Sequence, residues 1–112
     1  MMPAKPNSIE ALERSAGQAA GFLRTLAHAG RLRIVCALMD GELSASGLAR
    51  HAGLAAPALS QQAMILESSG LIARRRDGRS VMYRLSSERA RDLAMLLYRM
   101  FCDTPPTKGV RR

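Results

Sequence analysis

The two cysteines of this 112-residue chain, Cys36 and Cys102, are its only thiols, and a thiolate is the nucleophile that oxidants and sulfur donors modify. Arg33 lies one helical turn before Cys36, and Arg99 lies one turn before Cys102, so each guanidinium is placed to favour a thiolate. Cys102 falls at the negative end of a predicted helix, which makes Cys36 the better candidate for the first nucleophile. Both residues equally suit apolar packing, because free cysteines are often buried.

Arginine dominates the charge of the chain. The formal net charge is +8, the sequence pI is near 11.0, and only Lys5 and Lys108 among the 17 basic residues are lysines. The rigid donor fork of arginine suits phosphate oxygens and guanine edges, so this excess favours a nucleic-acid partner over a merely soluble basic surface. A cluster surrounds Asp77 and Gly78 and consists of Arg74, Arg75, Arg76, Arg79 and Arg84.

The spacing of apolar residues predicts the elements that must position these side chains. A first helix follows Asn7 as its cap and ends near Leu26, and a break at Ala29 and Gly30 precedes the second helix. The other predicted elements are helices over 31–39, 44–53, 57–70 and 86–103, and strands over 71–76 and 79–85.

This order predicts a mainly α fold with a two-stranded β-hairpin wing, a winged helix-turn-helix. Ser44 caps the third helix, Pro57 fits the first turn of the fourth, and the Asp-Gly pair supplies the positive φ angles of a type I′ turn. The last helix carries an apolar stripe wider than so small a chain can bury alone: Leu93, Leu96, Leu97, Met100 and Phe101. We therefore expect a homodimer formed through the first and last helices.

The helix-turn-helix sequence from Glu42 to Leu54, continued by Ala58 to Gln62 and by Leu66 to Leu71, resembles the ArsR family of dimeric winged-helix repressors. The similarity extends over about residues 15 to 103 and includes the Asp-Gly hairpin. It implies a repressor that binds double-stranded operator DNA, with the helix near Pro57 in the major groove.

The resemblance also implies which residues contact DNA. Ser60, Gln61 and Gln62 are the candidates for base contacts, and the hairpin-tip residues Arg75, Arg76 and Arg79 are the candidates for phosphate contacts. The alternatives are that the polar side chains only solvate a helix surface and that the arginines only discourage strand pairing at an edge.

Family members release DNA when an inducer binds. A thiolate metal site on the third helix would need cysteines where Ser44 and Ser46 stand, and residues 86–103 contain no histidine for the metal site of the last helix. The placement of Cys36 and Cys102 instead resembles the sulfide-responsive branch of SqrR, BigR and HlyU. That resemblance implies a sensing pair which persulfides or polysulfides bridge by a disulfide or short sulfur chain, releasing DNA, since a second thiol resolves the modified first one.

Other functions remain open at this point. The thiols could serve a metal-responsive repressor with ligands from outside the pair, or could be structural cysteines of a constitutive DNA-binding protein. We do not expect an enzyme, because the chain has no Cys-x-x-Cys motif and no Gly-rich nucleotide loop. His28 and His51 have no ligand spacing, so we expect no metal site and no cofactor.

The expected folded unit spans 8–103, with loose tails at 1–7 and 104–112. No stretch approaches ~20 uninterrupted apolar residues, and the N-terminus lacks the pattern of a secretion signal. We therefore expect a cytoplasmic protein without a membrane partner. The thiols of such a protein are reduced by default, so any bridge between them is conditional.

Overall fold

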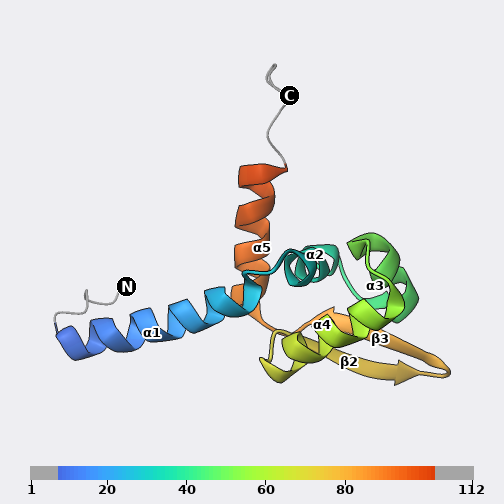
Figure 1. The fold of residues 1–112 in the computed structure, drawn as a ribbon, viewed down its shortest axis with the longest axis horizontal. Coiled ribbons are helices and arrows are strands. Elements are labelled where there is room, and N and C mark those ends of the chain that lie inside the picture. The colour runs from blue at the N-terminus through green and yellow to red at the C-terminus, as the bar shows by residue number, and fades with distance from the viewer. Residues whose placement is uncertain (1–7, 103–112) are drawn as a thin grey trace, which may run out of the picture.

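The structure, a computed structural model that describes residues 8–102, contains five helices and a small antiparallel sheet, whose β2–β3 hairpin lies at one edge of the molecule (Figure 1). In chain order the elements are α1 (Ile9–Leu26), α2 (Ala29–Ala37), β1 (Leu43–Ser44), α3 (Ala45–Ala52), α4 (Ala56–Ser68), β2 (Ile72–Asp77), β3 (Ser80–Leu85) and α5 (Glu88–Phe101). The mainly helical fold predicted from the sequence is confirmed.

Serine side chains begin three of the helices. Ser8, Ser44 and Ser87 each accept a hydrogen bond from a backbone N–H in the first turn, at 3.0 to 3.1 Å. Each bond satisfies a donor that the helix itself leaves unpaired. Ser44 confirms the expected start of α3, and Ser87 begins α5 within one residue of the predicted bound at 86. The cap predicted at Asn7 lies outside the described residues.

The break expected at Ala29 and Gly30 is wrong, because both residues belong to the first turn of α2. The chain turns at Ala27 instead, and His28 caps α2 by accepting a hydrogen bond from the backbone N–H of Arg31 at its Nδ1. Gly30 is buried, and a Cβ built there would lie 3.0 Å from the His28 ring. Its glycine therefore reflects close packing against the capping side chain rather than a helix break.

The sheet corrects the expected two-stranded ribbon, because it has three strands in the order β1-β3-β2. The short strand β1 pairs with β3 through Leu43 opposite Tyr83, and it escaped notice because two residues are too short for a pattern of alternation. The hairpin of β2 and β3, called the wing below, lies where the sequence placed it. Its two turn residues are Gly78 and Arg79 rather than Asp77 and Gly78, and Gly78 has a φ of +65°.

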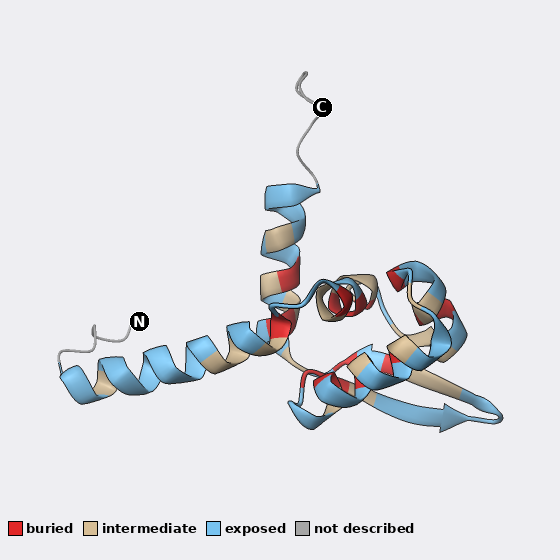
Figure 2. Ribbon diagram, in the orientation of Figure 1, coloured by how far each residue is buried: buried red, intermediate tan, exposed pale blue. Residues whose placement is uncertain are grey.

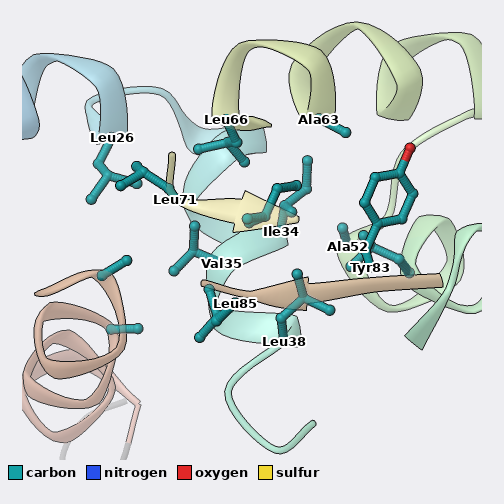
Figure 3. Close-up of a cluster of buried hydrophobic side chains, with 14 of the residues drawn as sticks. Leu26, Ile34, Val35, Leu38, Ala52, Ala63, Leu66, Leu71, Tyr83 and Leu85 are labelled. Atoms are coloured by element: carbon teal, nitrogen blue, oxygen red, sulfur yellow. The ribbon is translucent and has the colours of Figure 1, made fainter. Parts of the chain in front are cut away.

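The core is built around α2, which packs against α1, α3, α4 and α5 (Figures 1 and 3). Ile34, Val35 and Leu38 are at most 1% exposed and contribute the central side chains. They meet buried residues from the other elements: Leu26, Leu48, Ala52, Leu59, Ala63, Leu66, Leu71, Ile72, Tyr83, Leu85, Ala90 and Ala94. No polar or charged residue is buried in the described part of the chain. Burial of this apolar surface therefore holds the elements together.

The helices α1 and α5 project from this core and are mostly exposed along their length (Figure 2). Leu26 is the buried residue of α1, and Ala90 and Ala94 are the buried residues of α5. Large apolar side chains on the two helices stand in solvent, namely Ile9, Leu12, Leu23, Met95, Leu96, Tyr98, Met100 and Phe101. In the single chain, the apolar side chains from which we expect a dimer are therefore exposed to solvent.

The substitution Leu38→Ala tests the core at the C-terminal end of α2. We expect it to lower the free energy of unfolding by about 2 to 5 kcal/mol, because it removes buried methyl groups and leaves a cavity in the core. Met64→Ala is the control: its side chain is 63% exposed, so a change within about 0.5 kcal/mol is expected. Chemical denaturation at one protein concentration measures both, and equal effects would show that α2 is not the centre of the core.

Candidate functional site

Cys36 and Cys102 lie on one groove, which has a volume of about 820 Å³ and runs between α2, α3 and α5. Cys36 comes from the last turn of α2 and is half-buried, and Cys102 directly follows α5 and is exposed. Both thiols are free. The other residues of the groove are Arg33, Ala37, Met39, Asp40, His51, Met95, Tyr98 and Arg99. Folding thus brings together two thiols that are 66 positions apart in the sequence (102 − 36).

Packing and two hydrogen bonds position the walls of the groove. The guanidinium of Arg91 on α5 donates to the carbonyl of Met39 at 3.0 Å, which ties α5 to the turn after α2. Arg33 donates from Nε to the carbonyl of Ala52 at 2.6 Å, which ties α2 to the end of α3. These hydrogen bonds hold α5 and α3 beside α2. A covalent link between α2 and α5 would therefore join two helices that are already in contact.

The two thiols differ in their surroundings. Burial raises the pKa of the Cys36 thiol above its ordinary value, and the neighbouring Cys102 raises that pKa further. Arg33 directs its guanidinium at the Ala52 carbonyl. The pKa of Cys36 thus shifts away from the thiolate that this arginine was expected to favour. Cys102 is the solvent-accessible one, and its backbone N–H donates to the Tyr98 carbonyl at 2.7 Å to close the last turn of α5.

The three base-contact candidates lie on α4, but their surroundings differ. Ser60 and Gln61 are exposed. Gln62 is half-buried, and its Oε1 accepts a hydrogen bond from Nη1 of Arg31 at 2.8 Å. Arg31 also donates from Nε to the carbonyl of Thr25, so it joins the end of α1 to α4. The structure therefore gives Gln62 a partner inside the protein and leaves Ser60 and Gln61 open to solvent.

The wing carries the arginine cluster, and acidic residues engage part of it. Arg75 donates from Nε and Nη2 to the two carboxylate oxygens of Glu42, at 2.8 and 2.7 Å. Arg74 forms a salt bridge with Glu67 at 3.2 Å. The two remaining candidates, Arg76 and Arg79, are exposed and form no salt bridge among residues 8–102.

Sequence reasoning missed both acidic partners. Glu42 is 33 positions from Arg75, and no local motif links the two residues. Glu67 and Arg74 likewise face each other only because the wing folds back beside α4. The signal that was available is the cluster of basic residues itself, because arginine forms strong paired hydrogen bonds with a carboxylate that the fold brings within reach.

Two further properties concern metals and membranes. In the described range, residues 8–102, no group of three or more His, Cys, Asp or Glu side chains is arranged to hold a metal ion. None of the helices found between these bounds combines the length and apolar character that crossing a membrane requires.

A helix-turn-helix formed by α3 and α4 and followed by a basic hairpin is the architecture of winged-helix DNA-binding proteins. Residues 28–74 match the model of the arsR family of bacterial regulatory proteins. The biofilm growth-associated repressor of Xylella fastidiosa strain Temecula1 is 40% identical over 93 residues, which cover 83% of this chain and 82% of that protein. The chain belongs to the ArsR family.

Solved structures place the chain near two members of this family. Reduced HlyU from Vibrio cholerae has a TM-score of 0.79 at 34% identity, over 84% of this chain and 99% of that chain. The transcriptional repressor BigR from Xylella fastidiosa has a TM-score of 0.77 at 39% identity, over 85% and 97%. A homodimeric winged helix-turn-helix DNA-binding domain from Mycobacterium bovis has a TM-score of 0.67 at 26% identity, over 99% of both chains. These similarities support the BigR- and HlyU-like branch.

Alkylation at the two cysteines tests the electrostatics of the groove. We expect iodoacetamide to modify Cys102 before Cys36 at pH 7, since a raised pKa leaves less thiolate at Cys36 and burial restricts access to it. In Cys102→Ser the pKa of Cys36 should fall, because one of the two causes that raise it is removed, and its alkylation should then begin at a lower pH. Mass spectrometry of the two peptides measures both rates. Faster modification of Cys36 in the wild type would contradict this assignment.

Proposed function

We propose that this protein is a transcriptional repressor that binds operator DNA as a homodimer when its thiols are reduced and releases it when Cys36 and Cys102 become bridged. The observation that carries the proposal is that both thiols line one groove between α2 and α5. The helix α2 packs on α3 and α4, which make the helix-turn-helix. It therefore connects the groove directly to the DNA-binding elements.

DNA binding is assigned to α4 and the wing. Ser60 and Gln61 offer hydrogen-bonding groups on the exposed face of a helix that fits a major groove, with Gln62 beside them. The exposed Arg76 and Arg79 are suited to phosphate contacts, as is Arg75 once its carboxylate partner is displaced. The repressor named among the relatives and the DNA-binding domain among the structural neighbours support this role.

A persulfide is the only oxidant that bridging of the two cysteines requires. A cysteine thiolate attacks the outer sulfur of a donor R–S–SH, which transfers that sulfur as Cys–S–SH and releases R–SH. The second thiolate attacks the sulfur bonded to the first cysteine, forms the disulfide and expels hydrosulfide. Two cysteine thiols are thereby oxidised and the transferred sulfur is reduced. We assign the first attack to Cys102, because it is exposed and the pKa of Cys36 is raised.

A polysulfide can leave a longer bridge by the same two steps. The first thiolate displaces hydrosulfide from one end of the sulfur chain, and the second thiolate displaces hydrosulfide from the other end, so the inner sulfur atoms remain between the cysteines. A plain disulfide requires α-carbon separations of about 4.4 to 6.8 Å, whereas inserted sulfur atoms tolerate a wider gap. Polysulfide should therefore act at least as well as peroxide.

Bridging has a direct mechanical consequence in this fold. The link draws the C-terminal end of α5 against the last turn of α2, while α5 also carries the exposed apolar face assigned to the dimer. A shift of α5 then changes the spacing of the two α4 helices in the dimer. Two recognition helices must lie about 34 to 36 Å apart to read successive major grooves, so a change in spacing weakens binding.

Removal of either thiol tests the switch. We expect Cys36→Ser and Cys102→Ser to bind DNA like the reduced wild type, and to keep that affinity after exposure to polysulfide, because each lacks one end of the bridge. The wild type should lose affinity under the same treatment. Fluorescence anisotropy measures binding to a duplex that the reduced protein selects from a random library.

The paired variants act as mutual controls, since each keeps one thiol that polysulfide can still modify. Release by either variant to the extent seen with the wild type would exclude a two-thiol switch. A loss of wild-type affinity on adding zinc to the reduced protein, without polysulfide, would favour the metal-responsive alternative instead.

The homodimer is proposed through α1 and α5. Large apolar side chains on both helices are exposed in the single chain, among them Leu12 at 54% and Leu96 at 43%. Exposed apolar surface of such extent, where it is contiguous, marks a protein interface more often than free surface. The homodimeric structural neighbour supports a dimer, and the choice of α1 and α5 rests on their exposed apolar side chains.

Light scattering tests the dimer. The wild type should have about twice the 12.1 kDa mass of the chain at micromolar concentration. Leu96→Glu should shift the mass toward that of one chain, because it places a charge in the apolar face of α5. Met64→Glu is the control on α4 and should remain dimeric. A monomeric wild type, or equal dissociation of both variants, would contradict the interface.

A further inference from the structure

The ion pair between Glu42 and Arg75 has the geometry with which arginine binds a phosphate. Two guanidinium nitrogens donate in parallel to two oxygens of one carboxylate, at 2.8 and 2.7 Å. Arginine uses the same planar fork for carboxylates and for phosphates. The carboxylate of Glu42 therefore occupies the donors that a DNA phosphate would use.

The backbone fixes Glu42 at this position. It directly precedes β1, whose Ser44 pairs with Met82 of β3, and Met82 pairs on its other side with Arg75 of β2. Glu42 thus approaches the wing from β1, across β3. Hydrogen bonding and the charge of Arg75, together with the charge of Arg84, lower the pKa of the Glu42 carboxyl despite some opposing desolvation, so it is ionised at neutral pH.

The other wing arginines differ from Arg75. Arg74 meets Glu67 through one nitrogen at 3.2 Å, a single contact rather than a fork. Arg76 and Arg79 form no salt bridge within residues 8–102. Both partners of the Arg75 pair remain reachable from solvent, with side-chain exposures of 48% for Arg75 and 27% for Glu42. A phosphate can therefore reach the pair and compete with the carboxylate.

We propose that Glu42 sets the DNA affinity of the wing by acting as an intramolecular substitute for a phosphate. Arg75 contacts DNA only when a phosphate displaces the Glu42 carboxylate, and each binding event loses this ion pair. Arg76 and Arg79 contact phosphate without such competition. The inference rests on the proposed DNA-binding role of the wing and adds to it a residue that opposes binding.

The test uses reduced protein and a DNA duplex of random sequence, because a phosphate contact does not depend on base identity. We expect Glu42→Gln to bind about two- to fivefold more tightly than the wild type, the range that loss of one exposed ion pair allows. The dependence of log affinity on log salt should steepen by up to about 0.9, since the variant has no carboxylate that takes up a cation when a phosphate binds Arg75.

Two further variants distinguish two effects of Glu42→Gln on affinity: the release of Arg75 from its ion pair, and the simple removal of a negative charge. Asp40→Asn removes a charge from the same loop and has no salt bridge to Arg75, so its affinity should stay near that of the wild type. In an Arg75→Gln background, Glu42→Gln should have no effect on affinity. Circular dichroism checks that all variants keep the fold.

The outcomes distinguish this inference from the proposed function. Weaker binding by Glu42→Gln would show that Glu42 orients Arg75 for DNA, and would overturn the inference. So would an unchanged affinity, or a gain that Asp40→Asn or the Arg75→Gln background reproduces. A wild type that shows no salt-dependent binding to DNA would instead remove the proposed DNA-binding function, and the inference with it.

Discussion

The packing of α2 between all the other helices is the interaction on which the rest of the structure depends. Ile34, Val35 and Leu38 are almost fully buried, and α2 is in contact with α1, α3, α4 and α5. The consequence for function is that α2 has two sides with different roles. One side supports α3 and α4, while the end that carries Cys36 faces α5. A helix in this position cannot move without repacking the core, because close-packed interiors transmit displacements rather than absorb them.

The absence of buried charge in the described residues leaves the electrostatics to the surface. Arginine side chains cluster on the wing and also line the thiol groove. On the wing, Arg74 and Arg75 form salt bridges with carboxylates from other parts of the chain. The turn after α2 connects these two regions over a few residues: Met39 and Asp40 line the groove, and Glu42 binds Arg75 on the wing. The basic surface is therefore a set of individually paired and unpaired arginines, and net charge alone does not describe it.

The sequence predicted what depends on local patterns. The Ser44 cap, the hairpin and the order of helices follow from spacing and from side-chain preferences that act within a few residues. Strand β1 was missed because it is defined by pairing with β3, far along the chain. The early start of α2 was missed because a histidine ring caps it and a glycine fits beneath that ring.

The candidate site shows the same difference between features set by local sequence and features set by distant contacts. The sequence identified both thiols, and folding brings them to one groove. It assigned the more reactive thiol by helix position and a nearby arginine, whereas burial governs Cys36 and Arg33 bonds a carbonyl of another helix. The partners of Gln62 and Arg75 were equally out of reach, since each comes from an element more than 30 positions away.

Mass spectrometry of the intact and digested protein after exposure to polysulfide tests the central claim most directly, namely that the groove allows one covalent link between α2 and α5 of the same chain. The account predicts a single-chain product that joins the Cys36 peptide to the Cys102 peptide, directly or through inserted sulfur atoms, and that a reductant reverses. Separate adducts on the two cysteines, or a link formed only between different chains, would contradict it.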